Sequence, residues 1–172
     1  MSIRKKQLFW GAGLAIGILA IGGIVHFARK APAKSTVKPA LKLTGWLKPV
    51  TAKVSSKFGY RVNPVSKIHQ FHNGIDLPVP LNTQVKNPQD GTVLDVYNNK
   101  DGGNQVLIRH KEGIVSGYAH LNKALVKKGE TIKKGQVIAL SGNTGKSTGP
   151  HVHMTLKDVK GNYLDPGTAI YS

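Results

Sequence analysis

The stretch GTVLDVYNNKDGGNQVLIRHKEGIVSGY, residues 91–118, decides the fold class. It holds short runs rich in β-branched residues that are bounded by Gly, Asn or Asp, as is typical of strands joined by turns. Two more runs of this kind follow, so the expected strands cover residues 91–97, 104–109, 114–118, 136–140 and 152–156. No window from residue 45 onward shows the long periodicity of a helix. The sequence therefore predicts an all-β domain, a compact antiparallel β-sheet or barrel-sandwich with long loops.

The amino-terminal part of the 172-residue chain is of a different kind. Residues 8–25 are all apolar or glycine, and as a helix they would be roughly 27 Å long, near the ~30 Å hydrocarbon thickness of a bilayer. Residues 26–28 close the gap, and Trp10 and Phe27 lie near the two ends. We therefore predict one transmembrane helix over residues 8–28, within a segment 1–30 that begins with a basic tip.

A cleaved signal peptide is the alternative interpretation of this segment. Basic residues precede the apolar run, and residues 31–33 (APA) resemble a small-residue cleavage site. The run is longer than the usual apolar region of a signal peptide, which favours an uncleaved anchor. Residues 31–44 contain prolines and lysines without an acidic residue, which indicates a linker. Residues 45–172 are enough for one domain with its own core.

Two short motifs in this domain carry candidate metal ligands: HNGID at residues 72–76 and HVH at residues 151–153. Catalytic zinc usually takes three nitrogen or oxygen ligands from a protein and leaves one position for water. The two histidines of HVH would share one face of a strand, so one can bind metal while its neighbour acts. Gly74 and nearby prolines argue for a turn or an irregular strand, so His72 and Asp76 are expected to lie in a loop. The chain has no cysteine, which excludes a thiol nucleophile.

Further segments extend the pattern: GYAHL at residues 117–121, the glycine-rich SGNTGKSTGP at 141–150, and SKFGYRVNP at 56–64. With them, residues 46–170 resemble the lysostaphin-type zinc endopeptidases, which cut peptide cross-links in bacterial peptidoglycan. The resemblance implies one zinc ion per chain, held by His72, Asp76 and His153. It also implies that His120 and His151 are catalytic histidines that do not bind the metal. All five residues are present.

The sequence departs from the family pattern at two places, Lys146, where a histidine is common, and Met154-Thr155, where an aromatic–acidic pair is common. Neither is expected to touch zinc. Amide hydrolysis also needs proton transfer and stabilisation of the developing oxyanion, and imidazoles serve both purposes. His120 and His151 are the motif histidines left for these roles. The sequence leaves open which is the base.

The net charge of +17 points to an anionic partner. Nucleic acid is not expected, because the lysines are scattered over turns and only 6% of residues are aromatic. We therefore predict a single-pass membrane protein that hydrolyses peptidoglycan stems or cross-bridges, with its catalytic domain on the periplasmic or wall side. The alternatives are a non-catalytic wall-binding or amidase-activating module, and a component of a virion, such as a phage lytic enzyme, or of a secretion machine. The cleaved bond and the oligomeric state stay open.

Overall fold

The computed structural model describes residues 43, 45–62 and 67–171. Its elements, in chain order, are β1 (Gly59–Val62), β2 (His69–His72), β3 (Gly74–Pro78), β4 (Gln84–Lys86), β5 (Gly91–Asn99), β6 (Gly103–His110), the 3-10 turn η1 (Lys111–Gly113), β7 (Val115–Leu121), β8 (Lys123–Ala124), β9 (Thr131–Ile132), β10 (Val137–Leu140), β11 (His151–Lys157), β12 (Tyr163–Leu164) and α1 (Gly167–Ile170). The strands β5, β6, β7, β10 and β11 are those that the sequence predicts.

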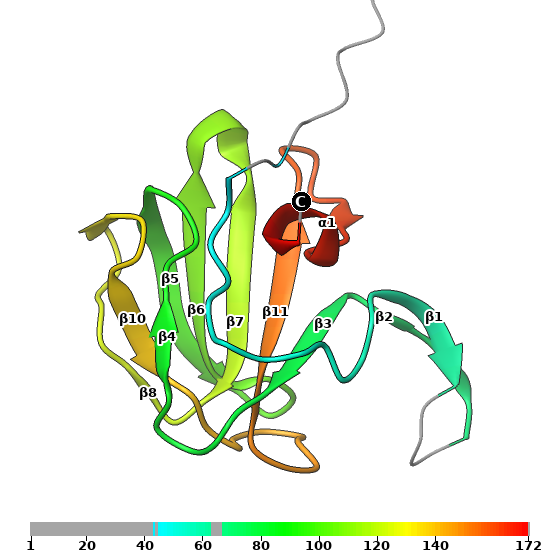
Figure 1. The fold of residues 1–172 in the computed structure, drawn as a ribbon. Coiled ribbons are helices and arrows are strands. Elements are labelled where there is room, and N and C mark those ends of the chain that lie inside the picture. The colour runs from blue at the N-terminus through cyan, green and yellow to red at the C-terminus, as the bar shows by residue number, and fades with distance from the viewer. Residues whose placement is uncertain (1–42, 44, 63–66, 172) are drawn as a thin grey trace, which may run out of the picture. The chain divides into compact units, whose positions relative to one another are not determined.

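A seven-stranded antiparallel sheet forms the body of this fold (Figure 1). Its strand order is β12-β11-β7-β6-β5-β9, and β3 also pairs with β11. The long strands β5, β6 and β7 follow one another in both sequence and sheet, because tight turns connect neighbouring antiparallel strands. The prediction of an all-β domain with antiparallel sheets is confirmed.

Strand β11 separates the core from the opposite face of the sheet. Val152, Met154 and Leu156 are fully buried in the hydrophobic core, whereas His151 and His153 alternate with them and are only partly buried. This alternation follows from the two-residue period of a strand, in which successive side chains point to opposite faces. The apolar residues of β11 therefore attach the strand to the core, and both histidines lie on the other face.

A second, three-stranded sheet completes the core. Its order is β4-β10-β8, and all its pairs are antiparallel. Val85 of β4 and Ile138 of β10 are fully buried and belong to the same hydrophobic cluster as Val106 and Met154 of the large sheet. Burial of each such side chain stabilises the folded state by about 1.5–3 kcal/mol relative to leaving that side chain exposed. The small sheet therefore covers the apolar face of the large one and leaves its other face free for a site.

Helix is scarce in the described ranges, where α1 has four residues and η1 has three. None of the helices in these ranges is long and apolar enough to cross a membrane. The predicted anchor at residues 8–28 lies outside the described residues, as does nearly all of the predicted linker at 31–44.

Candidate metal centre and active site

His72 and Asp76 lie on strands, and the prediction that they lie in a loop is wrong. His72 is the last residue of β2 and Asp76 is the middle residue of β3. Strand β3 pairs with β11 in a register that puts Asp76 opposite His153. The residues that suggested a loop have other functions here, since Pro78 ends β3 and Gly74 begins it beside β11. Pairing with a distant strand thus outweighs the local turn signals.

Gly74 allows β3 to approach β11 closely. A Cβ atom at this position would lie 2.2 Å from the carbonyl oxygen of Met154 and 2.9 Å from Cε1 of His153. These distances are too short for any side chain, because real Cβ atoms essentially never come within 3.0 Å of such atoms. The glycine of the HNGID motif therefore brings Asp76 within reach of His153.

Gly74→Ala is expected to push β3 away from β11 and to weaken the metal site. Overpacking of this kind costs about 1–3 kcal/mol of stability, so we expect a lower Tm and a lower zinc content after purification. The matched control is Gly149→Ala, because a methyl group there meets nothing within 4 Å. Thermal unfolding and metal analysis of both variants test this. Equal zinc content and equal Tm in the two variants would contradict the close-approach argument.

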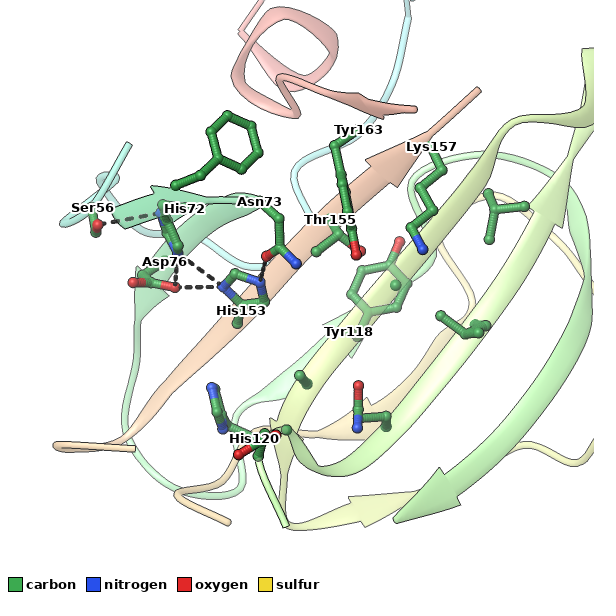
Figure 2. Close-up of a pocket in the computed structure, with 18 of the residues that line it drawn as sticks. Ser56, His72, Asn73, Asp76, Tyr118, His120, His153, Thr155, Lys157 and Tyr163 are labelled. Carbon is green, nitrogen blue, oxygen red and sulfur yellow. Dashed lines mark hydrogen bonds and ion pairs between the residues drawn. The ribbon is translucent and has the colours of Figure 1, made fainter. Parts of the chain in front are cut away.

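Three donor atoms converge between β2, β3 and β11 (Figure 2). His72 Nε2 lies 3.2 Å from Asp76 Oδ1 and 3.2 Å from His153 Nδ1. His153 Nδ1 lies 2.8 Å from Asp76 Oδ1. Tetrahedral zinc with bonds of ~2.0–2.1 Å places its ligand atoms roughly 3.3 Å apart. The spacing and the chemistry of the three donors therefore fit a zinc ion.

The outer nitrogens of both histidines are held by acceptors. His72 Nδ1 donates to the carbonyl oxygen of Lys57 at 2.8 Å. His153 Nε2 donates to Asn73 Oδ1 at 3.0 Å. With these protons outside, the lone pairs of His72 Nε2 and His153 Nδ1 face the centre, as metal binding requires. Neither Asn73 nor the Lys57 carbonyl was predicted from the sequence, although Asn73 lies within the HNGID motif.

Asp76 supplies the negative charge of the cluster. Burial by itself would raise the pKa of this carboxyl group, but without a metal a ring proton can also point inward, and hydrogen bonds and charges from His153 and His72 then outweigh burial. They hold the pKa of Asp76 well below its usual range. The carboxylate is therefore ionised throughout the neutral range, so protons do not compete with a metal ion for it.

His120 and His151 lie beside this cluster and are not part of it. The centres of their two rings are 4.6 Å apart, and His151 Nε2 is 3.7 Å from Asp76 Oδ1. His120 Nδ1 donates to the carbonyl oxygen of Thr144, and His151 Nδ1 donates to that of Gly149, both at 2.8 Å. These bonds leave Nε2 of each ring with a free lone pair. Each histidine can therefore accept or deliver a proton through Nε2.

The backbone around His120 is unusual. His120 has a φ of +59°, which is rare for a residue with a side chain, and its amide donates to the Gly102 carbonyl at 2.7 Å. Such conformations cost about 1–3 kcal/mol and persist where the surroundings enforce them. The glycine-rich segment provides this restraint, because a Cβ atom on Gly142 would lie 2.7 Å from the carbonyl oxygen of His120. The segment thus packs against the histidine backbone.

Burial also sets the protonation of His120. It lowers the pKa of His120 below the ordinary histidine value, and the hydrogen bond to Thr144 opposes this shift only in part. The nearby His151 and His153 lower the pKa further. The neutral imidazole is therefore favoured at neutral pH.

The five predicted site residues line one cavity of about 1240 Å³ on the free face of the large sheet. Its floor contains the small residues Gly117 and Ala119 of β7, which pair with Thr155 and His153 of β11. This cavity is a groove that extends beyond the metal cluster and has room for an extended peptide. The structure thus brings all five residues together, as the sequence predicts.

A three-donor metal cluster with two further histidines in an open groove is typical of a metal-dependent hydrolase. The sequence profile described as peptidase family M23 matches residues 70–166. The chain belongs to this family, and the resemblance to lysostaphin-type peptidases is confirmed.

Several characterised proteins are similar to this domain. The peptidoglycan DD-endopeptidase ShyA of Vibrio cholerae is 45% identical over 111 residues, which are 63% of this chain and 26% of that protein. The catalytic domain of lysostaphin from Staphylococcus simulans has a TM-score of 0.62 and 30% identity, over 70% of this chain and 93% of that domain. A zinc-containing peptidase from Vibrio cholerae has a TM-score of 0.64 and 35% identity, over 73% of this chain and 39% of that one. The chain spans about a quarter of the length of the curated relatives that it matches.

Proposed function

We propose that residues 45–172 form a zinc endopeptidase that hydrolyses peptide bonds in the stems or cross-bridges of peptidoglycan. The observation that carries this proposal is the convergence of His72 Nε2, Asp76 Oδ1 and His153 Nδ1 within 3.2 Å of one another at the groove. The similarity to ShyA, which is named a peptidoglycan DD-endopeptidase, supports the substrate class.

In this proposal His72, Asp76 and His153 hold the metal, and no fourth side chain from the described residues joins their cluster. His151 Nε2 stands 3.7 Å from Asp76 Oδ1 and outside the cluster of three. When bound, zinc supplies Lewis acidity that lowers the pKa of water and polarises a carbonyl group. A catalytic zinc site needs one coordination position without a protein ligand, whereas in a structural zinc site protein ligands fill all four positions.

His120 and His151 would move protons and stabilise charge. The Nε2 atom of one ring accepts a proton as water attacks the peptide carbonyl carbon. A protonated Nε2 then donates to the departing amine nitrogen or to the carbonyl oxygen as it gains charge. The Thr144 and Gly149 carbonyls hold the two rings in the tautomer that leaves Nε2 free for these steps. Either ring can serve as the base.

Digestion of purified cell walls tests the proposal. Walls with direct stem-to-stem cross-links and walls with glycine bridges are incubated with the zinc-loaded protein, and new amino termini are identified by mass spectrometry. We expect a new free amine, whose position identifies the cleaved bond. A new reducing sugar without a new amine would indicate a glycosidase. No product from any wall would favour a non-catalytic wall-binding or amidase-activating module.

We also infer that residues 8–28 anchor the protein in a membrane, with the catalytic domain on the extracytoplasmic side. The uninterrupted apolar run at residues 8–25 supports this, as does a substrate that lies outside the cytoplasmic membrane. We expect the full-length protein to stay in the membrane fraction after carbonate washing. Recovery of a mature chain that begins near Lys34 would establish a cleaved signal peptide instead.

A further inference from the structure

Two basic side chains lie in one row across the large sheet. Lys157 of β11 pairs with Val115 of β7, and Val115 pairs with Arg109 of β6. All three residues line the same cavity as the metal cluster. Lys157 is four residues beyond His153 on the same face of β11, so their Cα atoms are roughly 13 Å apart. This basic row therefore lies about four extended residues from the metal cluster.

The floor between the metal cluster and the basic row is low. Gly117 of β7 lies there, opposite Thr155 of β11 and Leu107 of β6. A Cβ atom on Gly117 would already lie 2.6 Å from Thr155 Oγ1, so no side chain rises from this point. An extended peptide can therefore lie along the floor from the metal cluster to the basic row.

The charges of the groove do not balance. The carboxylates that line it already have partners: Asp76 contacts His72 and His153, Asp101 pairs with Lys146 at 2.6 Å, and Asp158 accepts hydrogen bonds from the Lys160 backbone amide and the Asn162 side chain. Within the described part of the chain, no carboxylate lies within ion-pair distance of Lys157 or Arg109. Lys157 and Arg109 are thus left for a ligand, as is Arg61 elsewhere in the lining of the groove.

Lys157 is held in place by an aromatic ring. Its Nζ lies 4.5 Å from the centre of the Tyr163 ring, and Tyr163 pairs with Lys157 across β11 and β12. Figure 2 shows both side chains on the same side of the sheet as His153 and Thr155. A cation–π contact orients the ammonium group without neutralising it. When an anion binds here, the Lys157 side chain therefore loses less conformational entropy than a free surface lysine would lose.

We propose that Lys157 and Arg109 bind a free carboxylate of the peptide substrate, about three to four residues from the cleaved bond. Charge-assisted hydrogen bonds to two cations favour a carboxylate over a carboxamide. The groove thereby selects anionic stem peptides over amidated stems and neutral glycine bridges. This inference rests on the proposed endopeptidase function and adds a substrate class to it.

A matched pair of substrates tests the inference. Two cross-linked stem-peptide dimers are used, identical except that the stem carboxyl groups are free in one and carboxamides in the other. With the zinc-loaded full-length protein, we expect kcat/KM to be roughly tenfold higher for the free carboxylates, mainly through KM. Lys157→Met and Arg109→Gln should each lose most of this preference, and Lys157→Arg should keep it. Lys86→Met is the control, because it removes the same charge from β4 outside the groove.

Each outcome has a defined meaning. Equal cleavage of the two dimers by the wild-type protein would overturn the carboxylate inference and leave the endopeptidase function standing. A preference that survives in Lys157→Met and Arg109→Gln would overturn it too. If neither dimer is cleaved, the proposed function fails, and calorimetry then decides the inference separately. Tighter binding of the free-carboxylate dimer that weakens in Lys157→Met would support it, and equal binding would overturn it.

Discussion

Asp76→Ala is expected to lose its zinc and to hydrolyse no peptide bond above the uncatalysed rate. Asp76 Oδ1 lies within 3.2 Å of a nitrogen of both His72 and His153, and it is the anionic member of the cluster. Without it, two imidazoles and no carboxylate remain, which lowers the affinity for the metal and leaves its coordination geometry less well defined. His72→Ala and His153→Ala should behave in the same way. Metal analysis and steady-state kinetics of the purified variants measure both effects.

The control for this prediction is a second carboxylate of the groove. Asp101→Asn should retain about one zinc ion per chain, because its carboxylate pairs with Lys146 and not with the cluster.

Binding of zinc to the folded state should also raise stability, by about 2.7 kcal/mol at a hundredfold excess over Kd. The wild-type Tm should therefore fall on chelation and recover with zinc, whereas the Tm of Asp76→Ala should not respond. Wild-type cleavage rates in a zinc-free protein would refute the metallopeptidase function.

His120→Ala and His151→Ala are expected to keep about one zinc ion and a folded domain, yet to lose ~10²–10⁴-fold in kcat. A positioned acid–base group contributes a factor of this size. Neither side chain is among the three converging donors, so metal content should not change. Metal analysis, circular dichroism and single-turnover kinetics measure the three properties separately.

The comparison with His153→Ala makes this prediction sharp, because His151 and His153 lie two residues apart on one face of β11. A general disturbance of the strand would affect metal content in both variants alike. If His151→Ala lost zinc and His153→Ala retained it, their roles would be exchanged. His69→Ala is the control, since His69 is exposed on β2 and does not line the cavity. It should keep both zinc and activity.

The longer strands were predictable from the sequence because each carries a local pattern. The β-branched runs of β5, β6, β7, β10 and β11 are bounded by turn residues, and all five were found near their expected limits. Strand β3 was missed, since it has five residues and contains Gly74 and Pro78. It is a strand because it pairs with β11, more than 70 residues later, and no local window contains that partner.

Part of the candidate site was also predictable from local sequence patterns. The spacings of HNGID and HVH point to four of the residues that line the groove, and the resemblance to a known family adds His120. The atoms that orient these side chains are mostly backbone. The Lys57, Thr144 and Gly149 carbonyls hold His72, His120 and His151. Every residue has a carbonyl group, so a sequence carries no signal for the one that is used. The roles of the five residues stay predictions until the variants are measured.

Because side chains alternate along β11, a change in the length of this strand by one residue is expected to abolish activity completely. His151 and His153 share the strand with Val152, Met154 and Leu156, which are fully buried. Insertion or deletion of one residue would turn the imidazoles into the core and the apolar side chains into the groove. No partly active intermediate lies on that route. Mutations that adjust specificity gradually are therefore expected to accumulate in the loops and at the strand ends around the groove, while the length of β11 stays constant.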